Sequence, residues 1–532
     1  MPQSTPFRRP IRLYVILVLT VYAAGLMHGL SRPWTGMHDW NGAFYSQLAR
    51  NFLRYPAAVH HGMGVIAVGQ TTPPPEERSL YANHPPALVW LVAGAFSAAG
   101  ESEAIARALP ILASLLSLWL FMVLIRPTWG SEAAWLAGLI YALMPMSVYF
   151  GRMVNHEPLC LCLMLASAVA LRGALQPAVP ASRRRKRLAL WAGGIAFLVW
   201  TDWPGILFAG LTSLWAAWQW RRNRLGLGQF AFIFFVSAAA TLSLICFLVY
   251  AGLDGRWSGL GDIFFNRRSS APDLRNATAL AHIAGNLTWP IAALVLVYLV
   301  SQGWSRMVSR RTGRYSPNEE PMGGCEAMGL VTITGLIWVL LFWRLFKIHN
   351  YWMFYLGPWI ALSAARTLLD LRAALSRYAG ASAQSILYGV LAVVAVTELI
   401  GADRYFARTF VDNATIAAWR EIQRRTQPSD RVMLSWSPVT HESAGNWALR
   451  TIDPPQLAYY MDRAFDVTTD PRFVMESART HPLYVIPQVT ILKDPAKFES
   501  LRRFNAAPAG DLLLIEVRQG AAATPPDKPS EM

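Results

Sequence analysis

The sequence predicts a polytopic α-helical membrane protein of about eleven spans, followed by a small extracytoplasmic α/β domain. Of its 532 residues, 54% are hydrophobic and only 15% are charged, whereas soluble globular chains carry about 25% charged residues. The apolar residues come in blocks suited to membrane helices, and these blocks stop near residue 402. The pattern therefore divides the chain into a membrane module at residues 1–402, an α/β domain at 403–520 and a disordered tail at 521–532.

Eleven apolar runs are suited to membrane helices. They are residues 12–30, 105–125, 131–150, 157–175, 188–201, 204–220, 229–252, 286–304, 326–346, 351–366 and 383–402. The sequence TDWP interrupts a long apolar stretch, and because Pro204 can end or kink a helix, we predict a tight external turn there. A further run at residues 85–99 is shorter than the roughly 20 residues of a straight span, so we place it in the outer membrane interface.

Lysine and arginine orient these spans. With the N-terminus inside, the inner segments hold 20 of these residues, including the RRRKR run at 183–187, and the outer loops before residue 403 hold 12. The positive-inside rule favours this orientation, and eleven spans then place residues 403–532 outside. The net charge of +16 is explained by short basic loops between apolar blocks, so we expect no nucleic-acid partner.

The first external loop, residues 31–104, contains an amphipathic segment. Trp40, Phe44, Leu48 and Phe52 recur every four residues and share one helical face. Such a stripe predicts a helix that lies in the membrane surface. The alternative is a helix of the same pattern packed against the external domain.

The C-terminal region alternates short apolar runs with amphipathic segments. Residues 431–436, 483–487 and 511–518 are predicted to be strands, and residues 413–427, 454–465 and 494–504 are predicted to be helices. Strands alternating with helices indicate a small α/β domain. The four cysteines are too few for a disulfide framework and are interpreted as ordinary apolar residues.

Polar residues at the outer ends of the spans are the candidates for function. All ten histidines fall outside or at outer helix ends in this topology. Arg152, His156 and Glu157 lie in GRMVNHEP, which joins two spans, and ionisable groups at that depth are costly and are functional candidates. The alternative is a structural ion pair between Arg152 and Glu157.

Three motifs occur in order along the first half of the chain. An Asp follows the first span in MHDW (37–40), NHPPALVW (83–90) leads into the segment GESEAIAR (100–107), and GRMVNHEP (151–158) follows the third span. This order resembles the GT-C family of polyprenyl-phosphate-sugar-dependent glycosyltransferases, which includes protein O-mannosyltransferases and the lipid A aminoarabinose transferase. The resemblance covers residues 10–220 well and is weaker through KIHNYWMFYLGPW at 347–359.

The resemblance implies an inverting glycosyltransferase in a bacterial inner (plasma) membrane, with an extracytoplasmic active site. The donor would be a sugar on a polyprenyl phosphate among the membrane lipids, and the acceptor a lipid, glycan or protein. Transfer needs a base for the acceptor proton and cations for the departing phosphate. Asp39 is the expected catalytic base, with a helix N-cap as its alternative role, and Glu157 is expected to assist.

Six residues are candidates for contact with the donor phosphate: His84, Arg152, Arg267, Arg268, Lys347 and His349. His84 stands where some relatives carry Lys. No cofactor and no metal ligand set is predicted. A divalent cation on Asp39 and Glu157, together with His38 or His156, is the alternative, but these residues lack a diagnostic ligand spacing.

Two other classes of protein fit parts of the pattern. A transporter or lipid flippase would suit eleven spans, but it should place ionisable groups near the middle of its spans, whereas this chain keeps nearly all of them at the ends. Asp202, in TDWP, is the exception to follow. A non-catalytic assembly protein with a relic site is the third hypothesis.

Overall fold

The structure is a computed structural model that describes residues 8–253, 277–312, 322–346, 348–379, 382–444, 447–478 and 480–517. The chain forms two compact units. The helical unit comprises Met1–Ser31, Asn83–Leu91 and Ala104–Arg408, and the mixed unit comprises Arg32–Ala82, Val92–Glu103 and Thr409–Met532. Most of the first external loop therefore folds with the C-terminal region, although the two are far apart in the sequence.

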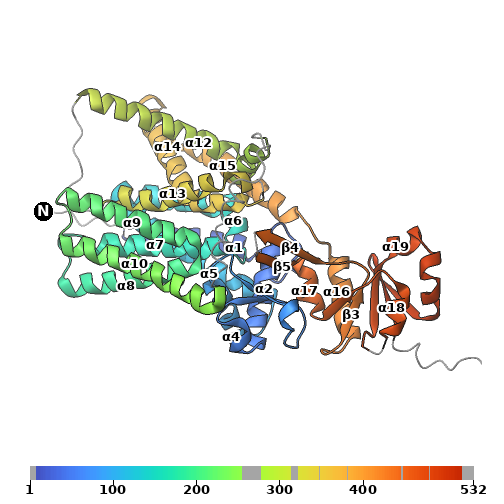
Figure 1. The fold of residues 1–532 in the computed structure, drawn as a ribbon. Helices are drawn as coiled ribbons and strands as arrows, with labels where there is room; N and C mark the ends of the chain where they lie inside the picture. The colour runs from blue at the N-terminus through green and yellow to red at the C-terminus, as the bar shows by residue number, and fades with distance from the viewer. Residues whose placement is uncertain are drawn as a thin grey trace, which may run out of the picture. The chain divides into compact units, whose positions relative to one another are not determined.

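The helical unit is built from long apolar helices (Figure 1). They are α1 (Arg8–Met27), α5 (Glu103–Leu143), α6 (Pro145–Phe150), α7 (His156–Ala174), α8 (Ala181–Thr201), α9 (Trp203–Arg221), α10 (Leu227–Leu248), α12 (Ala277–Thr312), α13 (Gly324–Leu341), α14 (Gly357–Ala379) and α15 (Ser382–Ala407). Within the described residues, six helices are long and apolar enough to cross a membrane, and Leu13–Met27 and Ala87–Ala99 are shorter apolar helices. The prediction of a polytopic helical membrane protein is thus confirmed, while the number of spans stays a prediction.

Breaks between these helices follow from single residues. The span predicted at 105–125 and most of the span predicted at 131–150 lie in α5, which is interrupted at Gly130, where the backbone leaves the helical conformation and its φ of 87° favours glycine. Pro145 begins the separate helix α6, where its missing N–H costs no helical hydrogen bond. The turn predicted at TDWP is present, because α8 ends at Thr201 and α9 begins at Trp203. Helices α7, α8, α9 and α10 pack side by side around this turn (Figure 1).

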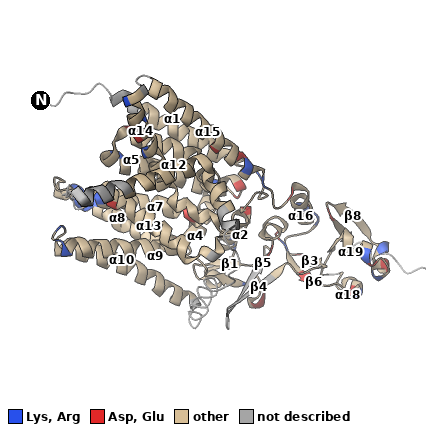
Figure 2. Ribbon diagram, turned by 90° about the horizontal axis from the view of Figure 1, so that it is seen from above, with Lys and Arg blue, Asp and Glu red and all other residues tan. Residues whose placement is uncertain are grey.

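Charged residues gather at the ends of the helices in this unit. Figure 2 shows the long helices mostly tan, with blue Lys and Arg concentrated at helix ends. This distribution is expected for helices whose middle turns lie in a bilayer, where an ionised side chain is costly. A partial exception is Glu398 in α15, which is fully buried and bonds to the Thr288 hydroxyl.

The mixed unit contains a five-stranded sheet in the order β6-β3-β7-β9-β8. Its strands are β3 (Arg431–Leu434), β6 (Ala464–Val467), β7 (Leu483–Pro487), β8 (Asn505–Ala509) and β9 (Leu512–Glu516). β3 runs parallel to β6 and β7, whereas β9 is antiparallel to both β7 and β8. The small C-terminal α/β domain is therefore confirmed, and Met433, Tyr484, Ile486 and Ile515 are part of its core.

Shorter elements complete this unit. The helices are α16 (Asn413–Arg425), α17 (Pro455–Met461), α18 (Pro471–Glu476), α19 (Gln488–Lys493) and the 3-10 helix η5 (Ala496–Arg503), and the hairpins are β1–β2 (Gly64–Ile66, Ser79–Tyr81) and β4–β5 (Val439–Ala444, Trp447–Ile452). The prediction of a single helix over 454–465 is wrong at its C-terminal end. It ends at Met461, because Asp462 adopts a left-handed conformation (φ 49°) and the chain then enters β6.

Helix α2 (Asp39–Arg54) carries the predicted apolar stripe, but its central residues, from Gly42 to Asn51, are all buried, the polar ones included. It packs against α17 and β1, and Phe44, Leu48 and the polar residue Arg50 are all buried. The Arg50 guanidinium donates to Glu101 from Nε at 2.8 Å and to the Tyr459 carbonyl at 2.9 Å. A membrane-surface helix would keep its polar face in water, so the structure favours the alternative, packing within a folded unit.

Candidate functional site

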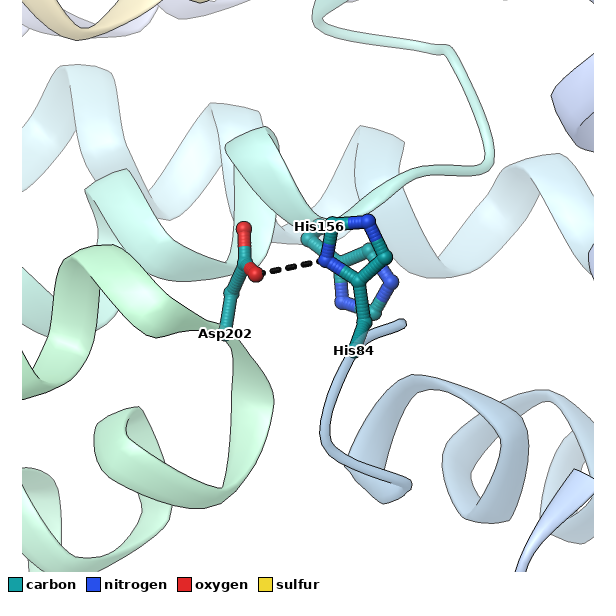
Figure 3. Close-up of side chains that lie close together, drawn as sticks. All are labelled: His84, His156 and Asp202. Carbon is teal, nitrogen blue, oxygen red and sulfur yellow. Dashed lines mark hydrogen bonds and ion pairs between the residues drawn. The ribbon is translucent and has the colours of Figure 1, made fainter. Parts of the chain in front are cut away.

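The helical unit buries a group of polar side chains where three segments meet (Figure 3). His84 precedes α4 (Ala87–Ala99), His156 begins α7, and Asp202 occupies the turn between α8 and α9. His156 and Asp202 are each 1% exposed, and Glu157 beside them is 3% exposed. Polar and charged groups pay a desolvation cost at such sites, so their partners determine what the site can do.

Asp202 is held by the local structure of the α8–α9 turn. It is the N-cap of α9, and its carboxylate accepts a hydrogen bond from the Trp203 backbone N–H at 2.8 Å. The same Oδ1 atom lies 2.7 Å from His84 Nδ1. The Trp203 indole in turn donates to the Asn83 carbonyl at 2.7 Å. The side chains of Asp202 and Trp203 therefore each make one hydrogen bond to residues 83–84, and these two bonds join that segment to the α8–α9 turn.

His156 is fixed from the same turn. Its Nδ1 lies 2.7 Å from the Thr201 carbonyl oxygen, which can only accept, so we assign the proton to Nδ1. The ring stacks on His84 with 4.5 Å between centroids and 17° between planes. The α8–α9 turn thus positions both imidazoles.

Glu157 brings a second carboxylate close to Asp202. Asp202, Cys160 and Tyr355 are its electrostatic neighbours. Within the described part of the chain, Glu157 Oε2 is buried without a hydrogen-bond partner. An unsatisfied buried acceptor costs about 1–3 kcal/mol, which is tolerated more readily at a functional site than in a packed core.

A cation is a candidate ligand of this group, because one ligand atom from each of His84, His156 and Asp202 lies within 4.8 Å of the others. This group shares His156 with the cation site considered above as the alternative, but it contains neither Asp39 nor Glu157. Imidazole lone pairs lie in the ring plane, so two stacked rings only 17° from parallel do not point at one ion. As placed, the residues favour hydrogen bonding over coordination.

Asp39 belongs to the mixed unit. It is the first residue of α2, whose N-cap is His38 in a left-handed conformation (φ 60°). The Asp39 carboxylate accepts from the Gly36 N–H at 2.7 Å, and the Asp39 N–H donates to the Gly36 carbonyl at 3.1 Å. Its carboxylate thus closes the turn before the helix, and the N-cap role expected as the alternative falls to His38.

Two of the remaining predicted phosphate contacts, Arg152 and His349, lie in the described part of the chain. Arg152 is buried and donates to the carbonyls of His28 and Gly29, just beyond α1. His349 stacks on Trp352, with 4.7 Å between ring centroids, and bonds to Tyr351. Arg267, Arg268 and Lys347 lie outside the described residues. The carbonyl contacts give Arg152 a structural role that differs from the ion pair with Glu157 considered above.

Asp202 was not among the predicted site residues. Its signal in the sequence is a single acid between two apolar runs, directly before Trp203 and Pro204. That pattern also fits a simple helix cap, which Asp202 is. Only the fold shows that the same carboxylate reaches a histidine 118 positions earlier in the chain.

Comparison with known proteins agrees with this architecture. Residues 83–250 match the family model described as dolichyl-phosphate-mannose-protein mannosyltransferase, and this segment contains His84, His156, Glu157 and Asp202. A search of curated proteins found no significant match.

Solved structures of the GT-C type share the fold. ArnT from Cupriavidus metallidurans bound to undecaprenyl phosphate aligns with a TM-score of 0.59 and 14% identity, over 96% of this chain and 98% of ArnT. The oligosaccharyltransferase of Archaeoglobus fulgidus in its apo form aligns with a TM-score of 0.57 and 12% identity, over 91% of this chain and 70% of that protein. The chain therefore has the GT-C fold, and its resemblance to polyprenyl-phosphate-sugar-dependent glycosyltransferases is confirmed.

Proposed function

We propose that this protein is a membrane glycosyltransferase that moves a sugar from a polyprenyl-phosphate donor to a lipid, glycan or protein acceptor. The observation that carries the proposal is the group formed by the partly buried His84 and the buried His156, Glu157 and Asp202. It lies inside the segment that matches the mannosyltransferase model, in a chain that shares the fold of ArnT over nearly its whole length.

The reaction requires one proton transfer and one displacement. The acceptor hydroxyl or amine attacks C1 of the sugar, the bond from C1 to the phosphate oxygen breaks, and its electron pair leaves with the polyprenyl phosphate. We assign the role of base to Asp39, which takes the acceptor proton. Displacement from the face opposite the phosphate inverts the configuration at C1.

We propose further roles in the same reaction for Glu157 and the basic residues. Glu157 Oε2, which has no hydrogen-bond partner among the described residues, is suited to orient the acceptor by accepting a hydrogen bond. His84, and the other predicted cations Arg152, Arg267, Arg268, Lys347 and His349, are proposed to stabilise the phosphate through charge-assisted hydrogen bonds. The site is proposed to face the outside of a bacterial plasma membrane, where lipid-linked donors and envelope acceptors meet.

The fate of the sugar–phosphate bond tests this function against the transporter hypothesis. The purified protein is incubated with a panel of undecaprenyl-phosphate sugars and envelope acceptors, and free undecaprenyl phosphate and glycosylated product are measured by mass spectrometry. A glycosyltransferase forms both in equal amounts. If the protein instead moves an intact lipid-linked sugar across liposomes and cleaves no donor in the panel, the proposal is wrong.

A further inference from the structure

We propose that a polar pocket in the mixed unit binds a saccharide and serves as a subsite for a sugar-bearing part of the acceptor. The acceptor role rests on the proposed function and deepens it, because it selects acceptors that carry a glycan. The saccharide site itself is argued from the pocket alone. All residues that line the pocket belong to the mixed unit, in which helix α17 packs against both α2 and α16 (Figure 1).

The size of the pocket suits a small polar ligand. Its volume is about 230 Å³, whereas sites for drug-sized ligands measure about 300–1,000 Å³ and are mostly apolar. The lining combines arginine, glutamate, glutamine and tyrosine side chains from α2, α16, α17 and residues 101–103. A single sugar ring is a ligand of this size and polarity.

One part of the pocket wall is a fixed group of polar side chains. Arg50 of α2, whose side chain is 8% exposed, donates from Nε to both carboxylate oxygens of Glu101, at 2.8 and 3.0 Å. It also donates to the Tyr459 carbonyl, and its guanidinium lies 4.4 Å from the centre of the Tyr459 ring. The Tyr460 hydroxyl donates to Glu103 at 2.8 Å. These contacts hold two carboxylates in place at the pocket.

Helix α16 supplies hydrogen-bond donors to the same pocket. Arg420, Gln423 and Arg424 are spaced by three and four residues, so they share one face of the helix. Arg420 donates to Glu103 at 3.2 Å, and Arg424 donates to Glu421 at 2.7 Å. Their other side-chain N–H groups have no hydrogen-bond partner among the described residues, and the two side chains are 43% and 69% exposed. A ligand can therefore reach these donors from solvent.

The balance of charge indicates the class of ligand. Three arginines line the pocket, and the carboxylates of Glu101, Glu103 and Glu421 balance their charge. An anion would meet the two lining glutamates, and a cation would meet the arginines. A sugar hydroxyl both donates and accepts hydrogen bonds, and planar guanidinium and carboxylate groups can each bond two neighbouring polar atoms. A polyhydroxyl ligand therefore uses both kinds of group in the wall.

Helix α2 relates the pocket to the proposed base. Asp39 begins this helix and Arg50 lies eleven positions later, which corresponds to about 16 Å along the helix axis. A saccharide in the pocket is thus not the group that reacts at Asp39. It would be a remote part of the acceptor, and binding energy from remote parts of a substrate helps to orient the reacting group.

Saccharide binding by the full-length protein tests this site. The protein is reconstituted in lipid nanodiscs, because maltoside detergents carry sugar head groups, and is screened on an array of bacterial envelope glycans that includes lipopolysaccharide core and N-acetylglucosamine oligosaccharides. We expect at least one saccharide to bind, and calorimetry then measures its affinity. Inorganic phosphate, titrated as the competing anion, should not displace it.

Arg424→Ala and Arg502→Ala form a matched pair of variants. Each arginine bonds to a glutamate three residues earlier, at 2.7 and 3.1 Å, and the two side chains are 69% and 70% exposed, but of the two only Arg424 lines the pocket. Arg424→Ala should weaken saccharide binding about tenfold, the scale of a hydrogen bond from a charged group. Arg502→Ala should leave it unchanged. Gln423→Ala, which removes an uncharged donor, should also weaken binding, and both pocket variants should keep the wild-type melting temperature.

The acceptor role is tested with a donor and acceptor pair that the wild type uses. Arg424→Ala should lower kcat/KM for the acceptor about tenfold and leave the affinity for undecaprenyl phosphate unchanged. An unchanged kcat/KM would overturn the acceptor role.

The remaining outcomes separate this inference from the proposed function. If no saccharide on the array binds, or if Arg424→Ala and Arg502→Ala bind it equally well, the inference is wrong even when sugar transfer occurs. Phosphate that displaces the saccharide and no longer binds to Arg424→Ala would show an anion site and would also overturn it. A protein that binds a saccharide through Arg424 but cleaves no donor would overturn the proposed function and the acceptor role, and would confirm the saccharide site.

Discussion

At the scale of single residues, two aspartates that each bond a histidine differ in what surrounds them. Asp202 is enclosed at the α8–α9 turn, whereas the Asp466 side chain is 40% exposed on strand β6. Asp466 receives hydrogen bonds from His481 at 2.6 Å and from Arg431 at 2.7 Å and 2.8 Å. These hydrogen bonds lower the pKa of Asp466 well below its usual range, and the bond from His481 has the largest effect. Asp466 is therefore suited to stabilise the sheet, and Asp202 to serve a site.

The lowered pKa of Asp466 predicts a pH-dependent contribution to stability. A carboxyl group whose pKa is lower in the folded than in the unfolded protein stabilises the fold when it is ionised. This contribution is complete above the pKa in the unfolded chain, about 3.9, and is lost as the pH falls below that value. Asp466→Asn should therefore lower stability at pH 7 by about 1 kcal/mol, kept small by solvent exposure. Thermal unfolding of both proteins between pH 3 and 8 measures it. A difference that stays constant down to pH 3 would contradict the assignment.

At the scale of elements, the packing of α2 depends on a glycine. A Cβ atom at Gly42 would overlap the ring of Trp34, which is 1% exposed. Gly42→Ala should lower the melting temperature, because the buried ring has to move. Gly94, on α4 in the same unit, has no atom within 4 Å of such a Cβ, and Gly94→Ala should be neutral or stabilising by up to about 1 kcal/mol. Equal effects of the two substitutions in thermal unfolding would show that the close approach of α2 to Trp34 is unimportant.

The sequence predicts those elements whose signal is local. The long apolar runs, the turn at Pro204 and the strands β3, β7 and β9 are examples, because hydrophobic periodicity and proline act over a few residues. The environment of α2, by contrast, depends on residues far away in the sequence. Its apolar stripe fits a membrane surface as well as it fits the surface of a folded domain, and only the burial of Arg50 against Glu101 and Tyr459 distinguishes the two. Likewise, the sequence predicts a helix over the first residues of β6, because nothing in the local pattern shows that Asp462 adopts a left-handed conformation and ends α17. Asp202 follows the same rule, since its partner His84 is far away in the chain.

At the scale of the whole molecule, the orientation in the membrane is the open prediction. The basic run 183–187, at the start of α8, is expected in the cytoplasm, and α16 is expected outside. Because Cys246 and Cys325 are exposed, the test begins from a cysteine-free variant. A cysteine at position 185 should resist an impermeant thiol reagent in intact cells, and one at the exposed position 424 should react. Labelling at position 185 from outside would overturn the topology and the placing of Glu157 at the outer face.

The proposed chemistry as a whole depends on Asp39. In Asp39→Asn the side chain keeps an oxygen acceptor for the Gly36 N–H, so the turn before α2 should survive. An amide cannot act as a base, however, and a general base contributes about 10²–10⁴-fold to the rate.

The decisive measurement is therefore the single-turnover rate of sugar transfer by purified wild type and Asp39→Asn, with a donor and acceptor pair that the wild type uses. Undecaprenyl phosphate affinity and melting temperature are measured on the same samples. The account predicts a variant that folds and binds as the wild type does but transfers sugar about 10²–10⁴-fold more slowly. A variant that keeps most of the wild-type rate would show that Asp39 is not the base.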